Sequence, residues 1–200
     1  MAQYDRKDHF HQLAKREGYR SRAAYKLLEI QEKTRLLRRG QKLVDLGCWP
    51  GGWLQVASAC VGASGRVVGV DLAAIEPPLD LENVFAFEAD LSDSSTLERI
   101  RSELRGPADA LLCDAAPKLT GIRASDRARE EALLEAVESA VPALLKASGA
   151  LLLKLLECPE AQKIGQRIGR GFAKSRILVP RSTRKGSSER YLLALGRKPD

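Results

Sequence analysis

The chain alternates between short apolar runs and longer segments in which apolar residues recur at helical spacing. The apolar runs are 42–47, 65–72, 83–90, 109–117, 149–157, 174–180 and 190–196. Helical segments lie between several of them, near 54–61, 93–105, 126–146 and 160–171. Continuous apolar strands separated by helices are typical of a mostly parallel sheet covered on both faces. The pattern therefore predicts an α/β doubly wound, Rossmann-like fold.

A further helix is predicted ahead of the first strand, within residues 21–40. Ser21 suits its N-cap, and arginines just before Gly40 suit its C-terminal end. In the long helix near 126–146, Pro142 predicts a kink, because proline lacks the backbone N–H that a helix interior needs.

The length of 200 residues suits one domain, 1–200, in which residues 1–20 form a basic N-terminal segment that we expect to be flexible. The four cysteines are scattered without a C-x-x-C pair, which suits a reducing compartment. No apolar span has the length of a membrane helix, and the first residues lack the apolar stretch of a secretory leader. We therefore expect a cytoplasmic monomer with no membrane partner.

Positive charge is concentrated towards the two ends of the chain. Residues 1–26 carry seven Lys and Arg against three Asp and Glu, and residues 163–200 carry eleven against two. The middle, 27–162, is acidic, with fifteen against twenty-one. This distribution favours a polyanion-binding face, and the scarcity of aromatic residues favours phosphate contact over base stacking. A solvated basic surface without a partner is the alternative.

Charged residues mark the ends of successive predicted strands. Asp45 and the glycines of "DLGCWPGGW" accompany the first strand, Asp71, Asp90 and Asp114 end the next three, and Lys154 lies in the fifth. Ligands of such sheets bind outside the carboxyl ends of the strands. A charge among apolar residues is costly unless it is used or paired. We therefore expect a ligand and a reaction at this edge.

Asp71 follows Gly51 by twenty residues, the interval at which dinucleotide folds hold a ribose. The glycines do not follow G-x-G-x-x-G, however, and Pro50 removes an amide that a diphosphate would use. A nucleoside without phosphate fits better, with its ribose at Asp71, adenine near Asp90 and a zwitterionic tail near Asp45; S-adenosylmethionine is such a cofactor. A dinucleotide-dependent oxidoreductase is the alternative. The candidate cofactor contacts are Asp45, Gly47, Pro50, Gly51, Gly52, Trp53, Asp71, Leu72, Asp90, Leu91 and Asp114.

The motifs "SRAAYKL", "DLGCWPGGW", "DLAAIEP", "CDAAPKLTG", "LLLKLLE" and "SSERYLLALGRKP" together resemble the FtsJ/RrmJ (RlmE) family of RNA ribose 2′-O-methyltransferases. The resemblance implies a seven-stranded methyltransferase sheet with an antiparallel last strand. It also implies a uridine of large-subunit ribosomal RNA as substrate, met in the assembled large ribosomal subunit. The catalytic tetrad that it implies is Lys26, Asp114, Lys154 and Glu189.

A ribose hydroxyl must lose its proton as its oxygen attacks the methyl carbon. Two neighbouring ammonium groups repel each other, so one of them can act as a base near pH 7. We assign Lys154 as the general base and Asp114 as the group that orients its amine. Lys26 and Glu189 would position the hydroxyl and balance the charge.

No metal is expected, since His9 and His11 have no evident partner ligands. Two alternatives for the function are a transfer-RNA 2′-O-methyltransferase and a non-catalytic RNA-binding assembly factor on the same fold. The chain departs from the family's usual residues around the mouth of the site, which leaves the RNA target open. The departures lie at Trp49, Lys118, Leu119, Thr120, Leu155 and Leu156.

Overall fold

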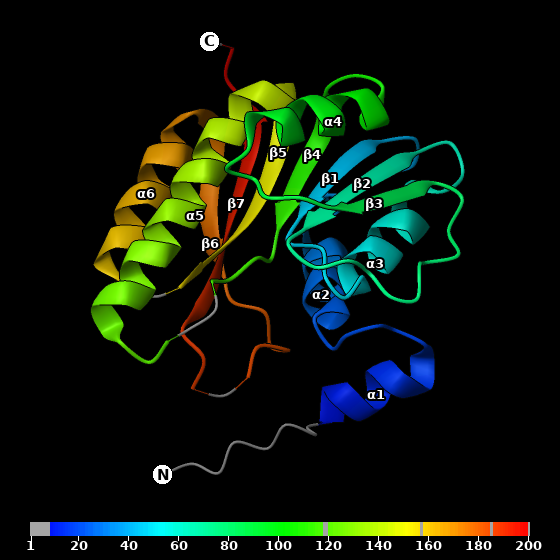
Figure 1. Ribbon diagram of the computed structural model, residues 1–200, viewed down its shortest axis with the longest axis horizontal. Coiled ribbons are helices and arrows are strands. Elements are labelled where there is room, and N and C mark those ends of the chain that lie inside the picture. The colour runs from blue at the N-terminus through cyan, green and yellow to red at the C-terminus, as the bar shows by residue number, and fades with distance from the viewer. Residues whose placement is uncertain (1–8, 118–119, 157, 185, 200) are drawn as a thin grey trace.

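A computed structural model describes residues 9–117, 120–156, 158–184 and 186–199, and it contains one seven-stranded sheet (Figure 1). The strand order is β3-β2-β1-β4-β5-β7-β6. The strands are β1 (Lys42–Leu46), β2 (Arg66–Asp71), β3 (Val84–Glu88), β4 (Ala108–Cys113), β5 (Leu145–Leu156), β6 (Phe172–Leu178) and β7 (Glu189–Arg197). The pairs among β1 to β5 are parallel, whereas β7 runs antiparallel between β5 and β6. The predicted fold, with its antiparallel last strand, is confirmed.

Two apolar clusters hold the helices against the two faces of the sheet. On one face lie α2 (Ala24–Thr34) and α3 (Gly52–Val61), and on the other lie α4 (Ser94–Leu104), α5 (Arg123–Leu144) and α6 (Pro159–Arg170). Figure 1 shows α5 and α6 side by side across the half of the sheet that contains β5, β6 and β7. Both faces of the central strands are therefore buried, as their continuous apolar runs predict.

Alternation along the strands directs several polar side chains towards α2 and α3. Leu112 and Leu152 belong to the cluster under these helices, so residues two positions further along β4 and β5 face the same way. On β7, Tyr191 belongs to that same cluster and pairs with Lys154. The strand register alone therefore directs side chains at the ends of β4, β5 and β7 towards the face of the sheet that α2 and α3 cover.

The first predicted helix is shorter than expected, and its predicted caps are wrong. The helix α2 begins at Ala24 after Ala23, which makes no side-chain capping bond, and it ends at Arg35 in the left-handed conformation. The side chain of Gln31 stops it by bonding both the N–H and the C=O of Leu37, at 2.8 and 2.7 Å, which turns the chain back into the core. Ser21 instead packs against the start of α3, where an added Cβ on Gly52 would lie 2.4 Å from the serine Oγ.

A short helix, α1 (His9–Glu17), precedes α2 and is not predicted by the sequence pattern. Its Phe10 ring lies 5.3 Å from the ring of Tyr25, whose hydroxyl donates to Glu17 at 2.7 Å. The rest of the basic N-terminal segment, residues 1–8, lies outside the described residues. Within the described part of the chain, no helix combines the length and the apolar character needed to span a membrane.

Candidate active site

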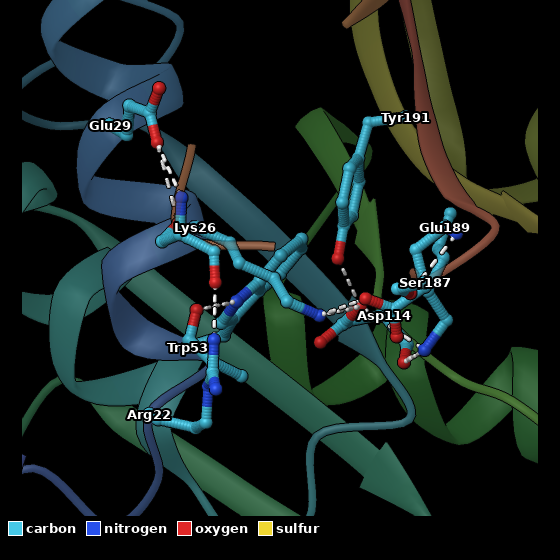
Figure 2. Close-up of polar contacts among 11 residues, drawn as sticks. Arg22, Lys26, Glu29, Trp53, Asp114, Ser187, Glu189 and Tyr191 are labelled. Carbon is cyan, nitrogen blue, oxygen red and sulfur yellow. Dashed lines mark hydrogen bonds and ion pairs between the residues drawn. The ribbon is translucent and has the colours of Figure 1, made fainter. Parts of the chain in front are cut away.

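The four residues of the implied tetrad come from four elements and meet at the carboxyl edge of the sheet. Asp114 directly follows β4, Lys154 lies near the end of β5, Lys26 lies in the first turn of α2, and Glu189 begins β7. The Asp114 Oδ1 atom lies 3.2 Å from Lys154 Nζ and 3.9 Å from Lys26 Nζ. On its other side, Lys26 Nζ donates to Glu189 Oε2 at 2.9 Å. Figure 2 shows the Lys26 side chain extending towards Asp114, with Glu189 nearby.

Burial makes this cluster electrostatically strong. The side chains of Lys154, Lys26 and Asp114 are 7%, 10% and 14% exposed, and that of Glu189 is 25% exposed. Two lysine amino groups thus face two carboxylates in a region from which most water is excluded, where charges interact more strongly than at the surface. Lys154 also donates to the backbone carbonyl of Asp114, which fixes its amine at the end of β4.

Tyr191 is a fifth member of this cluster that the sequence analysis missed. Its hydroxyl donates to Asp114 Oδ1 at 2.6 Å, and the residue is fully buried (Figure 2). Burial and then the Asp114 carboxylate raise the pKa of the Tyr191 hydroxyl, so it stays a hydrogen-bond donor. Its position two residues after Glu189 on a strand was an available signal, because residues at that spacing share a face.

The loop between β1 and α3 is closely packed and needs its glycines. Gly47 has a φ of +77°, and an added Cβ would lie 2.4 Å from Cβ of Ala115, just beyond Asp114. Gly51 has a φ of +109° and precedes the first residue of α3. The bare backbone therefore serves both the turn and its close approach to the loop after β4.

Asp45 is an unpartnered buried carboxylate beneath this loop. It is completely buried in β1, and within the described structure neither of its oxygens has a hydrogen-bond partner. Burial, followed by the charges of Asp114 and Asp71, raises the pKa of Asp45 well above its usual range. A buried acid without a partner is costly, and a cationic ligand group would compensate it. The ammonium group of S-adenosylmethionine has this charge, so the site fits the cofactor.

Asp71 and Asp90 hold the neighbouring loops in place. The Asp71 carboxylate accepts from the N–H of Trp49 at 2.9 Å and of Ala73 at 3.1 Å, which ties the loop after β2 to the loop after β1. The Asp90 carboxylate accepts from the N–H and hydroxyl of Ser92, and these bonds lower its pKa. Both carboxylates are therefore hydrogen-bond acceptors at the ends of β2 and β3, where the sequence predicts the ribose and the adenine to bind.

The other predicted cofactor contacts differ in their surroundings. Trp53 is buried in the core, donates from its indole to the carbonyl of Ala23 at 2.8 Å, and has its ring 5.9 Å from Tyr191. Its ring therefore packs beside Tyr191 of the candidate cluster. Its predicted contact with the cofactor stays a prediction. Leu72 is exposed, while Pro50 and Leu91 are half-buried.

Fold and site together define a methyltransferase that depends on S-adenosylmethionine. The model of the family described as FtsJ-like methyltransferase matches residues 19–197, and the chain belongs to this family. Relatives named ribosomal RNA large subunit methyltransferase E include those of Methanothrix thermoacetophila and Methanothermobacter thermautotrophicus. The first is 42% identical, with 94% of this chain and 72% of the relative covered; the second is 40% identical, with 94% and 89% covered.

Solved structures share the fold at lower identity. A Plasmodium falciparum protein described as a ribosomal RNA methyltransferase superposes with a TM-score of 0.79 at 22% identity, covering 91% of this chain and 100% of that chain. Fibrillarin of Aeropyrum pernix, with S-adenosyl-L-methionine bound, gives a TM-score of 0.60 at 18% identity, covering 88% and 75%. At these identities the likeness supports the fold alone.

Proposed function

We propose that the protein methylates a ribose 2′-hydroxyl of RNA, at a uridine of large-subunit ribosomal RNA in the large ribosomal subunit. The observation that carries this proposal is the buried cluster of two lysines and two carboxylates, centred on Asp114. Such a cluster suits deprotonation of a neutral hydroxyl, which a protein that only binds RNA does not need. The name of the 42% identical relative supports the ribosomal substrate. We further propose a single-domain cytoplasmic monomer without a metal.

The proposed mechanism assigns a separate task to each member of the cluster. Lys154 takes the proton of the 2′-hydroxyl through its neutral amine, and Asp114 orients that amine through the 3.2 Å contact. Lys26, held by Glu189, donates to the ribose oxygen and places it for in-line attack. Bound S-adenosylmethionine supplies a methyl group on a sulfonium. Asp45, Asp71 and Asp90 would hold this cofactor through its ammonium, ribose and adenine.

The proposed RNA entrance lies beside Lys26. A cavity of about 190 Å³ there is lined by Arg22, Ala23, Lys26, Arg184 and Glu189. Arg22 is anchored by its guanidinium to the carbonyl of Ser182, which joins the start of α2 to the loop before β7. Both basic ends of the sequence thus contribute an arginine to one opening, as a polyanion-binding face requires.

RNA affinity is expected to fall steeply with salt. For about four to eight phosphate contacts, the plot of log affinity against log salt has a slope of roughly −3 to −7, because counterions are released on binding. Arg184→Gln is expected to reduce this slope by about one. Fluorescence anisotropy with a labelled RNA at several salt concentrations measures both. A flat response of the wild-type protein would contradict the proposed polyanion face.

Removing the Tyr191 hydroxyl is expected to slow catalysis without weakening cofactor binding. Tyr191→Phe deletes a hydrogen bond to a charged acceptor, worth about 1.5–3 kcal/mol, so the orientation of Asp114 loosens and kcat falls roughly 10- to 100-fold. Single-turnover methyl transfer measures the rate of the reaction, and a cofactor titration measures the affinity for S-adenosylmethionine. Tyr19→Phe, at a ring that contacts Tyr25, is the control. An unchanged kcat in Tyr191→Phe would show that the bond has no role in the reaction.

The substrate itself can be tested directly. Large ribosomal subunits and isolated transfer RNA, both from cells that lack the protein, are incubated with the protein and labelled S-adenosylmethionine. We expect label in the subunit and, after nuclease digestion, in a 2′-O-methyluridine. Label in transfer RNA alone would favour the alternative enzyme, and no label in either would favour the assembly factor.

A further inference from the structure

A second and larger cavity lies on the other side of the Glu189 strand end from the RNA entrance. Its volume is about 440 Å³, within the range of about 300–1,000 Å³ that is usual for small-molecule sites. It is bounded by the first turns of α5, by the end of β5 and the chain just after it, and by the residue before β7. Its lining residues are Arg123, Asp126, Arg127, Glu130, Leu156, Cys158 and Ser188.

This cavity adjoins the proposed catalytic cluster. Leu156 lies two residues after Lys154 and pairs with Glu189, which directly follows Ser188. Figure 1 shows that α5 begins at the same edge of the molecule where β5 ends. A group seated in the cavity would therefore lie next to a ribose held at Lys154.

Glu130 is a buried acid in this cavity that the proposed mechanism does not use. It is only 4% exposed, and its Oε1 accepts from the N–H of Leu156 at 3.1 Å. Burial raises its pKa, while the Leu156 hydrogen bond and the positive charge of Lys154 act in the opposite direction. Through its hydrogen bond to Leu156, Glu130 reaches the end of β5, the strand that carries Lys154.

Two arginines place hydrogen-bond donors on the face of α5 that carries Glu130. Arg123, Arg127 and Glu130 follow one another at spacings of four and three residues, so they share one face of α5. Arg127 keeps about half of its side chain exposed and lies 3.7 Å from Glu160. The other acid of the cavity, Asp126, already has hydrogen-bond partners. Its oxygens accept from the N–H and hydroxyl of Thr120 and from the N–H of Gly121.

We propose that this cavity receives the base of the target nucleotide and that Glu130, together with Arg123 and Arg127, selects uracil. The inference rests on the proposed function and extends it to the choice of base. The imide edge of uracil presents one N–H donor between two carbonyl acceptors. A carboxylate on the same face as guanidinium groups is complementary to that edge. Cytosine presents an acceptor at N3 and an amino group at C4, which leave the carboxylate and the guanidinium mispaired.

The test compares two RNA substrates that differ in one base. Large-subunit RNA particles are prepared with uridine or cytidine at the methylated position, and kcat/KM for methyl transfer is measured on both. The wild-type protein is expected to prefer uridine by about 10- to 150-fold, the discrimination of one well-formed set of base contacts. Glu130→Gln is expected to lower this ratio to below about fivefold, because an amide can both donate and accept.

The ratio separates recognition from folding, since a less stable variant loses activity on both RNAs alike. Glu131→Gln, an exposed neighbour on α5, is the matched control and is expected to keep the wild-type ratio. If Glu130→Gln does not fold, Arg127→Gln at its half-exposed position provides the same measurement. An unchanged ratio in the variant, or a wild-type protein that does not distinguish uridine from cytidine, overturns the inference alone. A wild-type protein that methylates neither RNA overturns the proposed function instead.

Discussion

Lys154→Ala is expected to reduce methyl transfer at least about 1,000-fold while cofactor affinity changes no more than a few-fold. Removal of a general base alone slows a reaction by a factor of about 10² to 10⁴. Lys154→Ala also removes the ion-pair partner of Asp114, which adds to the loss. The Lys154 side chain is only 7% exposed, so bulk water has little access to the position of its amine. Single-turnover transfer and calorimetric cofactor binding measure the two quantities.

Lys163→Ala is the control for Lys154→Ala, because it removes an exposed lysine of α6 and leaves the catalytic cluster intact. Normal turnover in Lys154→Ala would overturn the assignment of the base.

Asp45→Asn is expected to stabilise the free protein and to weaken cofactor binding at least about tenfold. The substitution keeps the shape of the side chain and removes a buried titratable group that has no partner in the described structure and that the fold holds in its protonated form at a cost in stability. We expect a gain of about 1 kcal/mol or more near pH 7, which raises Tm by at least roughly 2–4 °C for a chain of this size. In the variant, the ammonium group of the cofactor no longer faces a carboxylate. Cofactor binding therefore weakens although the free protein becomes more stable.

The pH dependence of the Asp45 effect has a definite sign. Because the pKa of Asp45 is raised on folding, the folded protein holds the proton more tightly than the unfolded chain. Stability is therefore lost as the pH rises from the unfolded value, about 3.9, towards the folded pKa. The advantage of Asp45→Asn should be small near pH 4 and grow towards neutrality in thermal unfolding experiments. A constant difference across that range would show that the carboxylate is not the cause.

The strands were predictable because burial on both faces leaves continuous apolar runs in the sequence, whereas the antiparallel last strand was implied by the family resemblance. The same topology placed Asp71 and Asp114 at one edge, since parallel strands end together. Spacing alone could not bring Lys26 and Glu189 to that edge, because they lie 163 residues apart and meet only through the packing of α2 against the end of β7. Their place in the tetrad came from the family resemblance.

Features that depend on side-chain contacts were missed. The end of α2 depends on the two hydrogen bonds between Gln31 and Leu37, which no propensity rule contains. The helix α1 contains few apolar residues, and the contact of its Phe10 with Tyr25 becomes visible only in the tertiary structure. Glu130 belongs to a helix with many charged residues, and only the tertiary structure buries it beside Leu156.

The position of β7 has a consequence for biosynthesis. It is the last strand to be translated, yet it must insert between β5 and β6, which are made earlier. Until it leaves the exit tunnel, those two strands present unpaired edges, and Glu189 and Tyr191 are missing from the reaction centre. In the proposed mechanism, the chain therefore becomes active only after β7 has inserted between β5 and β6.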